Sequence, residues 1–205
     1  MKVISRSTIR NLARLLVALA ASVGLTATVS VGTAQAVTNV NVDASWQDFI
    51  TGGGVGGSSI AGPYDFTSTS VVKVTVTDAF CHGDEFGVYD NGVLLGDTSP
   101  IAPEFHTCPF RLFFPAVARA DDAILDPTFS QGTFYVAPGD HSLDFVNRVM
   151  WNDTATGTGA YFRLDSVDLV ADDCKDDGWK DYGALFTNQG DCVSLVQHML
   201  VRPAQ

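Results

Sequence analysis

From residue 38 to residue 170, short β-branched or aromatic runs alternate with turn residues, and no long window carries a helical period. This segment therefore cannot form a helix bundle, and the lack of strand–helix alternation excludes a doubly wound α/β sheet. Many short strands with frequent turns favour two packed antiparallel sheets. We expect an all-β chain, an antiparallel β-sandwich of the jelly-roll or galactose-binding-like kind, with a small C-terminal appendage closed by a disulfide.

Two strand patterns are clear. Residues 71–77 alternate and are rich in β-branched side chains, which predicts a half-buried strand. Residues 160–170 predict the last long strand, although the face shared by Tyr161, Arg163 and Asp165 mixes apolar and charged side chains. We therefore do not expect that face to be buried along its whole length.

Two hairpins are expected. Asn91-Gly92 tolerates positive φ at both positions, so the runs 86–90 and 93–96 should be joined by a type I′ turn. The runs 132–136 and 141–146 predict a second hairpin through Pro138-Gly139.

Helix is predicted in two short segments. The first is residues 115–125, which begins with Pro115 and stops before Asp126-Pro127. The second is residues 192–200, for which Asp191 is the expected N-cap. A charge-rich run follows Val170, so we place the sandwich at 37–170 and the appendage at 171–205, which is too small to fold without a crosslink.

The N-terminal segment has a different composition. Its four basic residues, with no acidic one, precede an uncharged stretch that ends Ala34-Gln35-Ala36. These are the marks of a secretory signal peptide, so residues 1–36 are predicted to be removed. A membrane anchor is the alternative, because the uncharged run is long enough to span, but its second half is rich in Gly, Thr and Ser. No later apolar run reaches about 18 residues, so no membrane span is expected after cleavage and the protein should be secreted, extracellular or associated with the cell envelope.

Charge excludes one class of partner. The chain has 12 basic and 23 acidic side chains, and leaving out residues 1–36 with their four basic residues gives 8 − 23 = −15. A nucleic-acid backbone must be met by clustered Lys and Arg, so we expect no nucleic-acid partner.

The four cysteines are Cys81, Cys108, Cys174 and Cys192. An even count in an exported chain predicts two disulfides, for which three pairings exist. We favour the local pairing, Cys81 with Cys108 and Cys174 with Cys192, because it closes two loops of similar size. Zinc binding is the alternative, but it needs cysteines or histidines clustered at short spacing, and each cysteine here stands alone.

Calcium is the cofactor that the acidic residues suggest. Aspartate brings hard oxygen ligands close to the backbone, and Asp84, Glu85, Asp90 and Asp97 surround the first predicted hairpin. We name Asp84 and Asp90 as candidate calcium ligands, while exposed turn aspartates explain the cluster equally well. The run that begins at Asp173 is not an EF-hand, because Lys175 occupies a ligand position.

No catalytic residue is predicted. The chain lacks the G-x-S-x-G elbow of a serine nucleophile, and none of His82, His106, His141 and His198 is placed for proton transfer. The glycine run 52–57 formally matches a dinucleotide fingerprint, but the residues after it cannot open a helix. A hydrolase with paired aspartates stays open, because spatial separation of the carboxylates decides that mechanism.

Two segments resemble known families. Residues 75–99 resemble a block of an uncharacterised secreted bacterial β-sandwich family, T-V-T-D-x-F-x-x-G-D-x-F-x-V-x-D-N-G-x-x-L-G-x-T-S, and the resemblance spans roughly residues 65 to 170. The resemblance implies a secreted β-sandwich but carries no established activity. The tail is similar to a module that ends many exported bacterial proteins, C-K-x-G-G-W followed by F-K-N-Q-G-D-C-V-S, with Asp177 and Thr187 departing from it.

These features predict a secreted, non-enzymatic β-sandwich that binds a carbohydrate or a surface, with an extracellular glycan or a cell-envelope component as partner. Loops on a rigid scaffold would carry the recognition, with Trp46, Tyr64, Tyr89 and Trp151 as candidate platforms for sugar rings. Burial in the core is the more frequent fate of such side chains. The alternatives are a secreted hydrolase that uses paired aspartates and a structural protein of the envelope.

Overall fold

The computed structural model describes residues 37–108, 119–152 and 154–201, so the predicted signal peptide lies outside the described residues. The strands are β1 Thr38–Asn39, β2 Gln47–Gly52, β3 Tyr64–Ser68, β4 Val71–Asp78, β5 Glu85–Asp90, β6 Val93–Asp97, β7 Gln131–Val136, β8 Gly139–Val149 and β9 Gly157–Val167. The helices are η1 Pro103–Phe105, α1 Ala120–Ala123, η2 Gly178–Leu185 and α2 Gln189–Val201, of which η1 and η2 are 3₁₀ helices.

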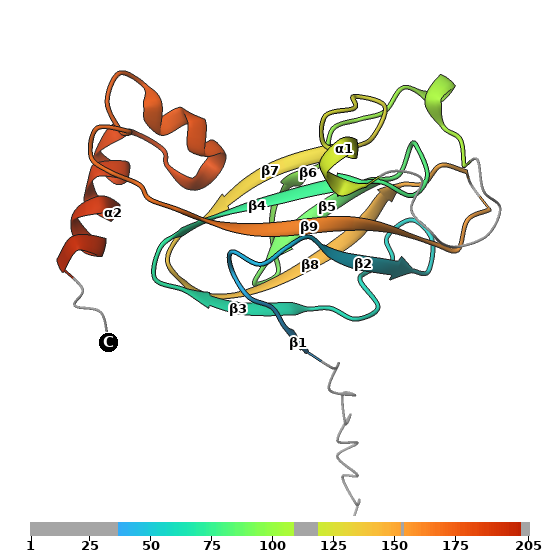
Figure 1. Ribbon diagram of the computed structural model, residues 1–205, viewed down its shortest axis with the longest axis horizontal. Helices are drawn as coiled ribbons and strands as arrows, with labels where there is room; N and C mark the ends of the chain where they lie inside the picture. Colours follow the sequence, from blue (N-terminus) through green and yellow to red (C-terminus); the bar gives the residue numbers. More distant parts are fainter. Residues whose placement is uncertain (1–36, 109–118, 153, 202–205) are drawn as a thin grey trace, which may run out of the picture. The chain divides into compact units, whose positions relative to one another are not determined.

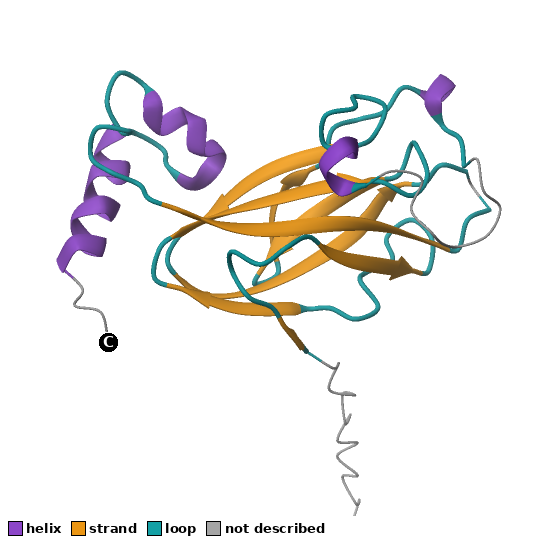
Figure 2. Cartoon of the chain, viewed as in Figure 1, coloured by secondary structure: helices purple, strands orange, loops and turns teal. Residues whose placement is uncertain are grey.

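The strands form two sheets that pack face to face (Figures 1 and 2). One sheet has the order β1-β3-β8-β5-β6 and the other β2-β9-β4-β7. From β2 onward, successive strands alternate between the sheets except at the β5–β6 hairpin, and all of these strands pair antiparallel. This is the strand order of a jelly roll, so the predicted all-β sandwich is confirmed.

Aromatic side chains fill the space between the sheets. Phe49 of β2 stacks on Phe145 of β8 with ring centroids 4.1 Å apart, and its ring meets Phe86 of β5 edge-on at 5.1 Å. Phe162 of β9 lies 5.0 Å from Phe145. Burying each of these rings stabilises the fold by about 1.5–3 kcal/mol.

The inward alternation of β9 also fixes the face of its mixed residues. Ala160, Phe162 and Leu164 are buried in the core. Tyr161, Arg163 and Asp165 must then point to the outer face of the four-stranded sheet, because successive side chains of a strand alternate.

The predicted hairpin at Asn91-Gly92 is confirmed, and the predicted hairpin at Pro138-Gly139 is wrong. Asn91 and Gly92 have φ of 50° and 78°, as the type I′ turn requires. However, β7 pairs with β4, whereas β8 pairs with β3 and β5 in the other sheet. The link at Ala137-Pro138 therefore crosses between the sheets.

A buried ion pair fixes this crossing. His141 Nδ1 lies 2.8 Å from Asp90 Oδ2, and His141 Nε2 lies 2.8 Å from the carbonyl oxygen of Ala137. Burial lowers the pKa of His141, but the hydrogen bond and charge of Asp90 outweigh burial, and the net shift is upward. The protonated ring donates to both acceptors and ties the crossing to the end of β5.

Strand β4 is buried on both faces, so the prediction of a half-buried strand is wrong on this point. Val71, at the start of β4, packs against buried residues of the C-terminal segment, and α1 packs near the end of the strand. Only Lys73 of this strand is partly exposed. Segments outside the sheet cover the two ends of the outer face of β4, which the alternation of the strand alone would leave to water.

The helices differ from the sequence prediction in their bounds. Helix α1 has four residues, and residues 109–118 lie outside the described part of the chain. Helix α2 begins at Gln189, where the side-chain oxygen of Asn188 accepts the Asp191 N–H at 3.0 Å. Asn188 is therefore the N-cap, and the expected cap Asp191 instead accepts from the N–H of Thr187, the residue before the N-cap, at 3.3 Å.

Both disulfides have the predicted pairing, Cys81 with Cys108 and Cys174 with Cys192, which indicates an oxidising environment. We call residues 171–201 the appendage. Its core of Cys174, Cys192, Phe186 and Val196 is continuous with Val71 and Leu169 of the sandwich. Over the described ranges, no helix has the length and apolar content needed to cross a bilayer.

Removing the second disulfide should loosen the appendage and leave the sandwich intact. The bridge closes a loop with a sequence separation of 18, and in the chain-entropy model such a crosslink is worth about 3 kcal/mol. In the double variant Cys174→Ser/Cys192→Ser, we expect hydrogen exchange to accelerate strongly in α2, while the amides of β4 and β9 stay protected.

The matched control is Cys81→Ser/Cys108→Ser, which removes the other bridge and should leave α2 protected. Equal loss of protection in α2 and β9 of the first variant would contradict a separately stapled appendage.

Candidate functional site

Polar and aromatic side chains cover the outer face of the β2-β9-β4-β7 sheet. The strand register places Arg163 opposite Thr75, and Thr75 opposite Thr133. The next outward row aligns Asp165, Lys73 and Tyr135 in the same way. Directly opposed residues share a face, so these side chains form one continuous surface across three strands.

Trp46, which immediately precedes β2, completes the first row. The Arg163 guanidinium carbon lies 4.8 Å from the centre of the Trp46 ring, and Trp46 Nε1 donates to Asp121 Oδ1 at 2.7 Å. Arg163 in turn binds Asp165, with Nε and Oδ1 3.0 Å apart. The half-buried indole is therefore held in place by a cation and a carboxylate.

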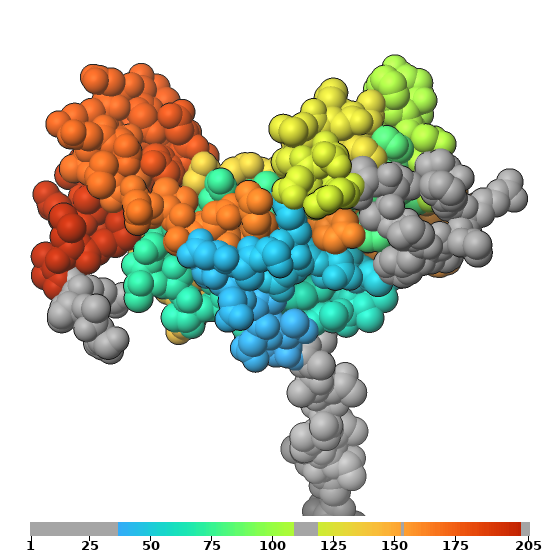
Figure 3. Space-filling view, in the orientation of Figure 1, coloured from blue at the N-terminus to red at the C-terminus, as the bar shows by residue number. Residues whose placement is uncertain are grey.

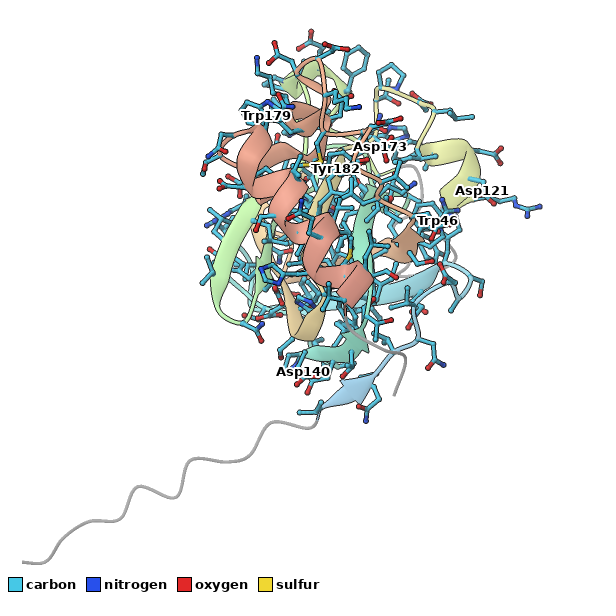
Figure 4. All side chains as sticks on the ribbon, turned by 90° about the vertical axis from the view of Figure 1, so that its left-hand side faces the viewer. Trp46, Asp121, Asp140, Asp173, Trp179 and Tyr182 are labelled. Carbon is cyan, nitrogen blue, oxygen red and sulfur yellow. A yellow bond between two sulfur atoms is a disulfide. The ribbon has the colours of Figure 1, made fainter. Side chains whose placement is uncertain are left out.

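The surface over this face is hollowed. Figure 3 shows a depression with strands of the four-stranded sheet as its floor, between the α1 segment, residues 119–130, and the appendage. Asp121 belongs to the first wall, and Tyr182 of η2 belongs to the second, where its ring meets Tyr135 edge-on at 5.1 Å. Figure 4 shows Trp46 beside Asp121, and Tyr182 in the appendage. We call this depression the groove; its residues are Trp46, Lys73, Asp121, Thr133, Tyr135, Arg163, Asp165 and Tyr182, with Thr75 buried beneath them at 6% exposed.

The groove offers hydrogen-bonding groups of both kinds. Burial, and then the charge of Asp181, raises the pKa of Tyr135, and burial, followed by the charge of Asp173, raises the pKa of Tyr182. Both phenols therefore stay protonated at neutral pH and can donate or accept. Lys73 Nζ lies 3.6 Å from Asp165 Oδ2, so Asp165 pairs with both cations of the floor.

Of the four predicted platforms, the structure places one in the groove. Tyr64 is 3% exposed and packs on Phe162 at 4.9 Å, so its prediction as a platform is wrong. Tyr89 lies in the other sheet, where its hydroxyl accepts from Arg148 at 2.8 Å. Trp151 follows β8 in a loop. Of the four predicted platforms, Trp46 is therefore the one that lies in the groove.

The aspartates predicted to bind calcium do not converge. Asp84 and Asp90 stand at opposite ends of β5, and Asp90 is bound to His141. Asp97 pairs with Arg148 at 2.8 Å, while Glu85 accepts the Ile101 N–H at 2.9 Å. Within the described residues, no three His, Cys, Asp or Glu side chains gather closely enough to hold a metal. The fold therefore does not assemble the pair Asp84 and Asp90.

Asp84 instead lies near Asp78, which the sequence analysis missed. Both side chains are 0% exposed. Asp84 accepts the Trp151 N–H at 2.8 Å and the Thr158 hydroxyl, and Asp78 accepts the Phe80 N–H at 3.0 Å. The inward alternation of Val72, Val74 and Val76 could have revealed that Asp78 also points inward.

The histidines have structural partners. His82 stacks on Phe129 with ring centres 4.0 Å apart, and His106 Nε2 lies 3.1 Å from the Ile101 carbonyl oxygen. His198 is exposed on α2. His141 is bound to Asp90, as described above.

Comparisons of the chain with protein families, with curated proteins and with solved structures find no significant match.

The buried carboxylate Asp84 should make the protein more stable in mild acid. Burial raises its pKa to about 6, whereas the unfolded value is near 3.8. The native state therefore binds the proton more tightly, and this stability is present below pH 4 and is lost as the pH rises through 6. The shift corresponds to about 3 kcal/mol.

In the variant Asp84→Asn, the amide oxygen can still accept from Trp151 while its NH₂ donates to Thr158. We expect urea unfolding in buffer with EDTA, from pH 4 to 7.5, to show a flatter pH dependence for this variant than for the wild type. His141 titrates in both proteins, and Asp78, whose pKa is raised by burial and by the charge of Asp84, titrates beside the substituted residue. The difference between the two curves therefore reports Asp84 together with its effect on Asp78. Parallel curves would contradict the upward shift.

Proposed function

We propose that the protein is a secreted, non-enzymatic β-sandwich that binds a glycan of the extracellular space or the cell envelope in the groove. The observation that carries the proposal is the half-buried indole of Trp46, held between Arg163 and Asp121 at the partly exposed outer face of the four-stranded sheet.

The chemistry of the groove suits a sugar ring. A pyranose has apolar C–H faces that stack on aromatic rings, and hydroxyl edges that need hydrogen-bonding groups beside them. Trp46 offers the ring, and Arg163 and Asp165 on the adjacent strand offer the donor and the acceptor. Because partners within the fold already hold these side chains, little conformational entropy is lost on binding.

The charges favour a neutral glycan. Asp165 pairs with both Arg163 and Lys73, and Asp121 Oδ1 lies 3.9 Å from Arg163 Nη1, so two carboxylates balance two cations. An acidic sugar would have to compete with these carboxylates for the guanidinium. A neutral sugar can bridge them through its hydroxyl groups without displacing a charge.

The hydrolase hypothesis has less support. Asp78 and Asp84 are the close pair of carboxylates that burial perturbs most, and both are fully enclosed. A glycosidase needs its two carboxyl groups on either side of an accessible bond. A structural role in the envelope remains as an outcome of the binding experiment.

Replacing Trp46 should abolish most of the binding. Binding energy concentrates in buried aromatic anchors, so Trp46→Ala is expected to weaken the affinity about 10-fold or more. A panel of neutral polysaccharides and cell-wall fragments, screened with the oxidised protein, identifies the glycan, and titration calorimetry on the best binder measures the change.

The matched control is Trp151→Ala, which removes the same ring from a loop outside the groove and should leave the affinity within 2-fold of the wild type. Circular dichroism checks that both variants keep the fold. Absence of binding to every glycan of the panel would favour the structural role, and equal losses in both variants would move the site away from the groove.

A further inference from the structure

The two buried aspartates connect the sheets at one end of the sandwich. Asp78 is the last residue of β4, and Asp84 immediately precedes β5 in the opposite sheet. The loop between them carries Cys81, which is bonded to Cys108. Asp84 also reaches Thr158 of β9 and the N–H of Trp151, which follows β8. The pair therefore lies where four strands of both sheets end or begin.

The two carboxylates lack a matching positive charge. No Lys or Arg of the described residues forms an ion pair with either of them. The one basic group that acts on Asp84 is the ring of His106, which lies against Gly83 and binds the Ile101 carbonyl. Two adjacent buried carboxylates without compensation would cost several kcal/mol each.

One oxygen of this pair has no hydrogen-bond donor. Asp78 Oδ2 is the only fully buried side-chain nitrogen or oxygen of the described residues that lacks a partner. The other buried polar side chains of the sandwich, such as Asn147 and Thr51, are hydrogen-bonded. Buried polar atoms are almost always satisfied, so an orphaned carboxylate oxygen beside a second carboxylate indicates a missing positive partner.

We propose that Asp78 and Asp84 bind a calcium ion between the two sheets at this end of the sandwich. Two carboxylates carry the charge that a divalent cation balances, whereas one proton would neutralise only one of them. Calcium accepts a mixture of carboxylate, hydroxyl, carbonyl and water oxygens, which suits two aspartates beside the Thr158 hydroxyl. Magnesium demands stricter octahedral geometry and gives up its water reluctantly, so calcium fits better.

Thermal unfolding tests the proposal. The oxidised protein is freed of metal with EGTA, dialysed into chelator-free buffer at pH 7.5 and unfolded with increasing CaCl₂ or MgCl₂. Calcium sites of extracellular modules have dissociation constants of about 0.1–1 mM. At 10 mM calcium the Tm should then rise by roughly 3–11 °C, with saturation, and the same concentration of magnesium should have little effect.

The variants Asp78→Asn and Asp84→Asn should each lose this calcium-dependent shift. Asp97→Asn is the matched control, because Asp97 is a half-exposed carboxylate bound to Arg148 on the neighbouring hairpin, and it should keep the full shift. If either buried variant does not fold, calorimetric titration of the wild type decides the question. One calcium per chain supports the site.

Two results would overturn the proposal. One is a wild-type protein that takes up no calcium up to 10 mM. The other is a Tm that rises on acidification to pH 5 but does not respond to calcium at pH 7.5, which would show that the pair is neutralised by protons alone. Both readouts are independent of glycan binding.

Discussion

The packing of Phe49, Phe145 and Phe162 between the two sheets is the interaction on which the rest of the structure depends. Because successive residues of a strand alternate, burying Phe162 sends Arg163 to the outer face, and burying Phe49 sends its neighbours on β2 outward as well. The aromatic core therefore determines both the stability of the sandwich and which side chains reach the groove. A register slip of one residue would exchange the two sets.

The outer face of the β2-β9-β4-β7 sheet forms the floor of a groove because two short segments, the α1 segment and the appendage, lie on either side of it. Each is too small to bury a core of its own, so each depends on the sandwich and on a nearby crosslink. The appendage uses Val71 and Leu169 as part of its core, and the α1 segment packs Ala123 and Phe129 against Ala79. The floor between them stays partly exposed at Lys73, Thr133 and Tyr135, because neither segment covers these side chains completely.

Features encoded by neighbouring residues could be predicted from the sequence. Asn91-Gly92 dictates its own turn, and the run from Val71 to Thr77 dictates a strand. The error at Pro138 arose because a turn and a crossing between sheets use the same residues, and only pairing with distant strands separates them. The groove could not be predicted from the sequence either, because Trp46, Asp121 and Arg163 come together only when three distant segments fold.

The two ends of the sandwich handle buried charge differently. At one end, His141 and Asp90 form an ion pair in which both ring nitrogens have acceptors, so the charges compensate within the chain. At the other end, Asp78 and Asp84 are buried more deeply, and no Lys or Arg of the described residues forms an ion pair with either of them. Burial of an unpaired charge is far more costly than burial of a pair, which is the physical basis of the calcium site that we propose at the second end. For the secreted protein that we propose, extracellular calcium would supply the positive charge that the chain itself does not place beside the two carboxylates.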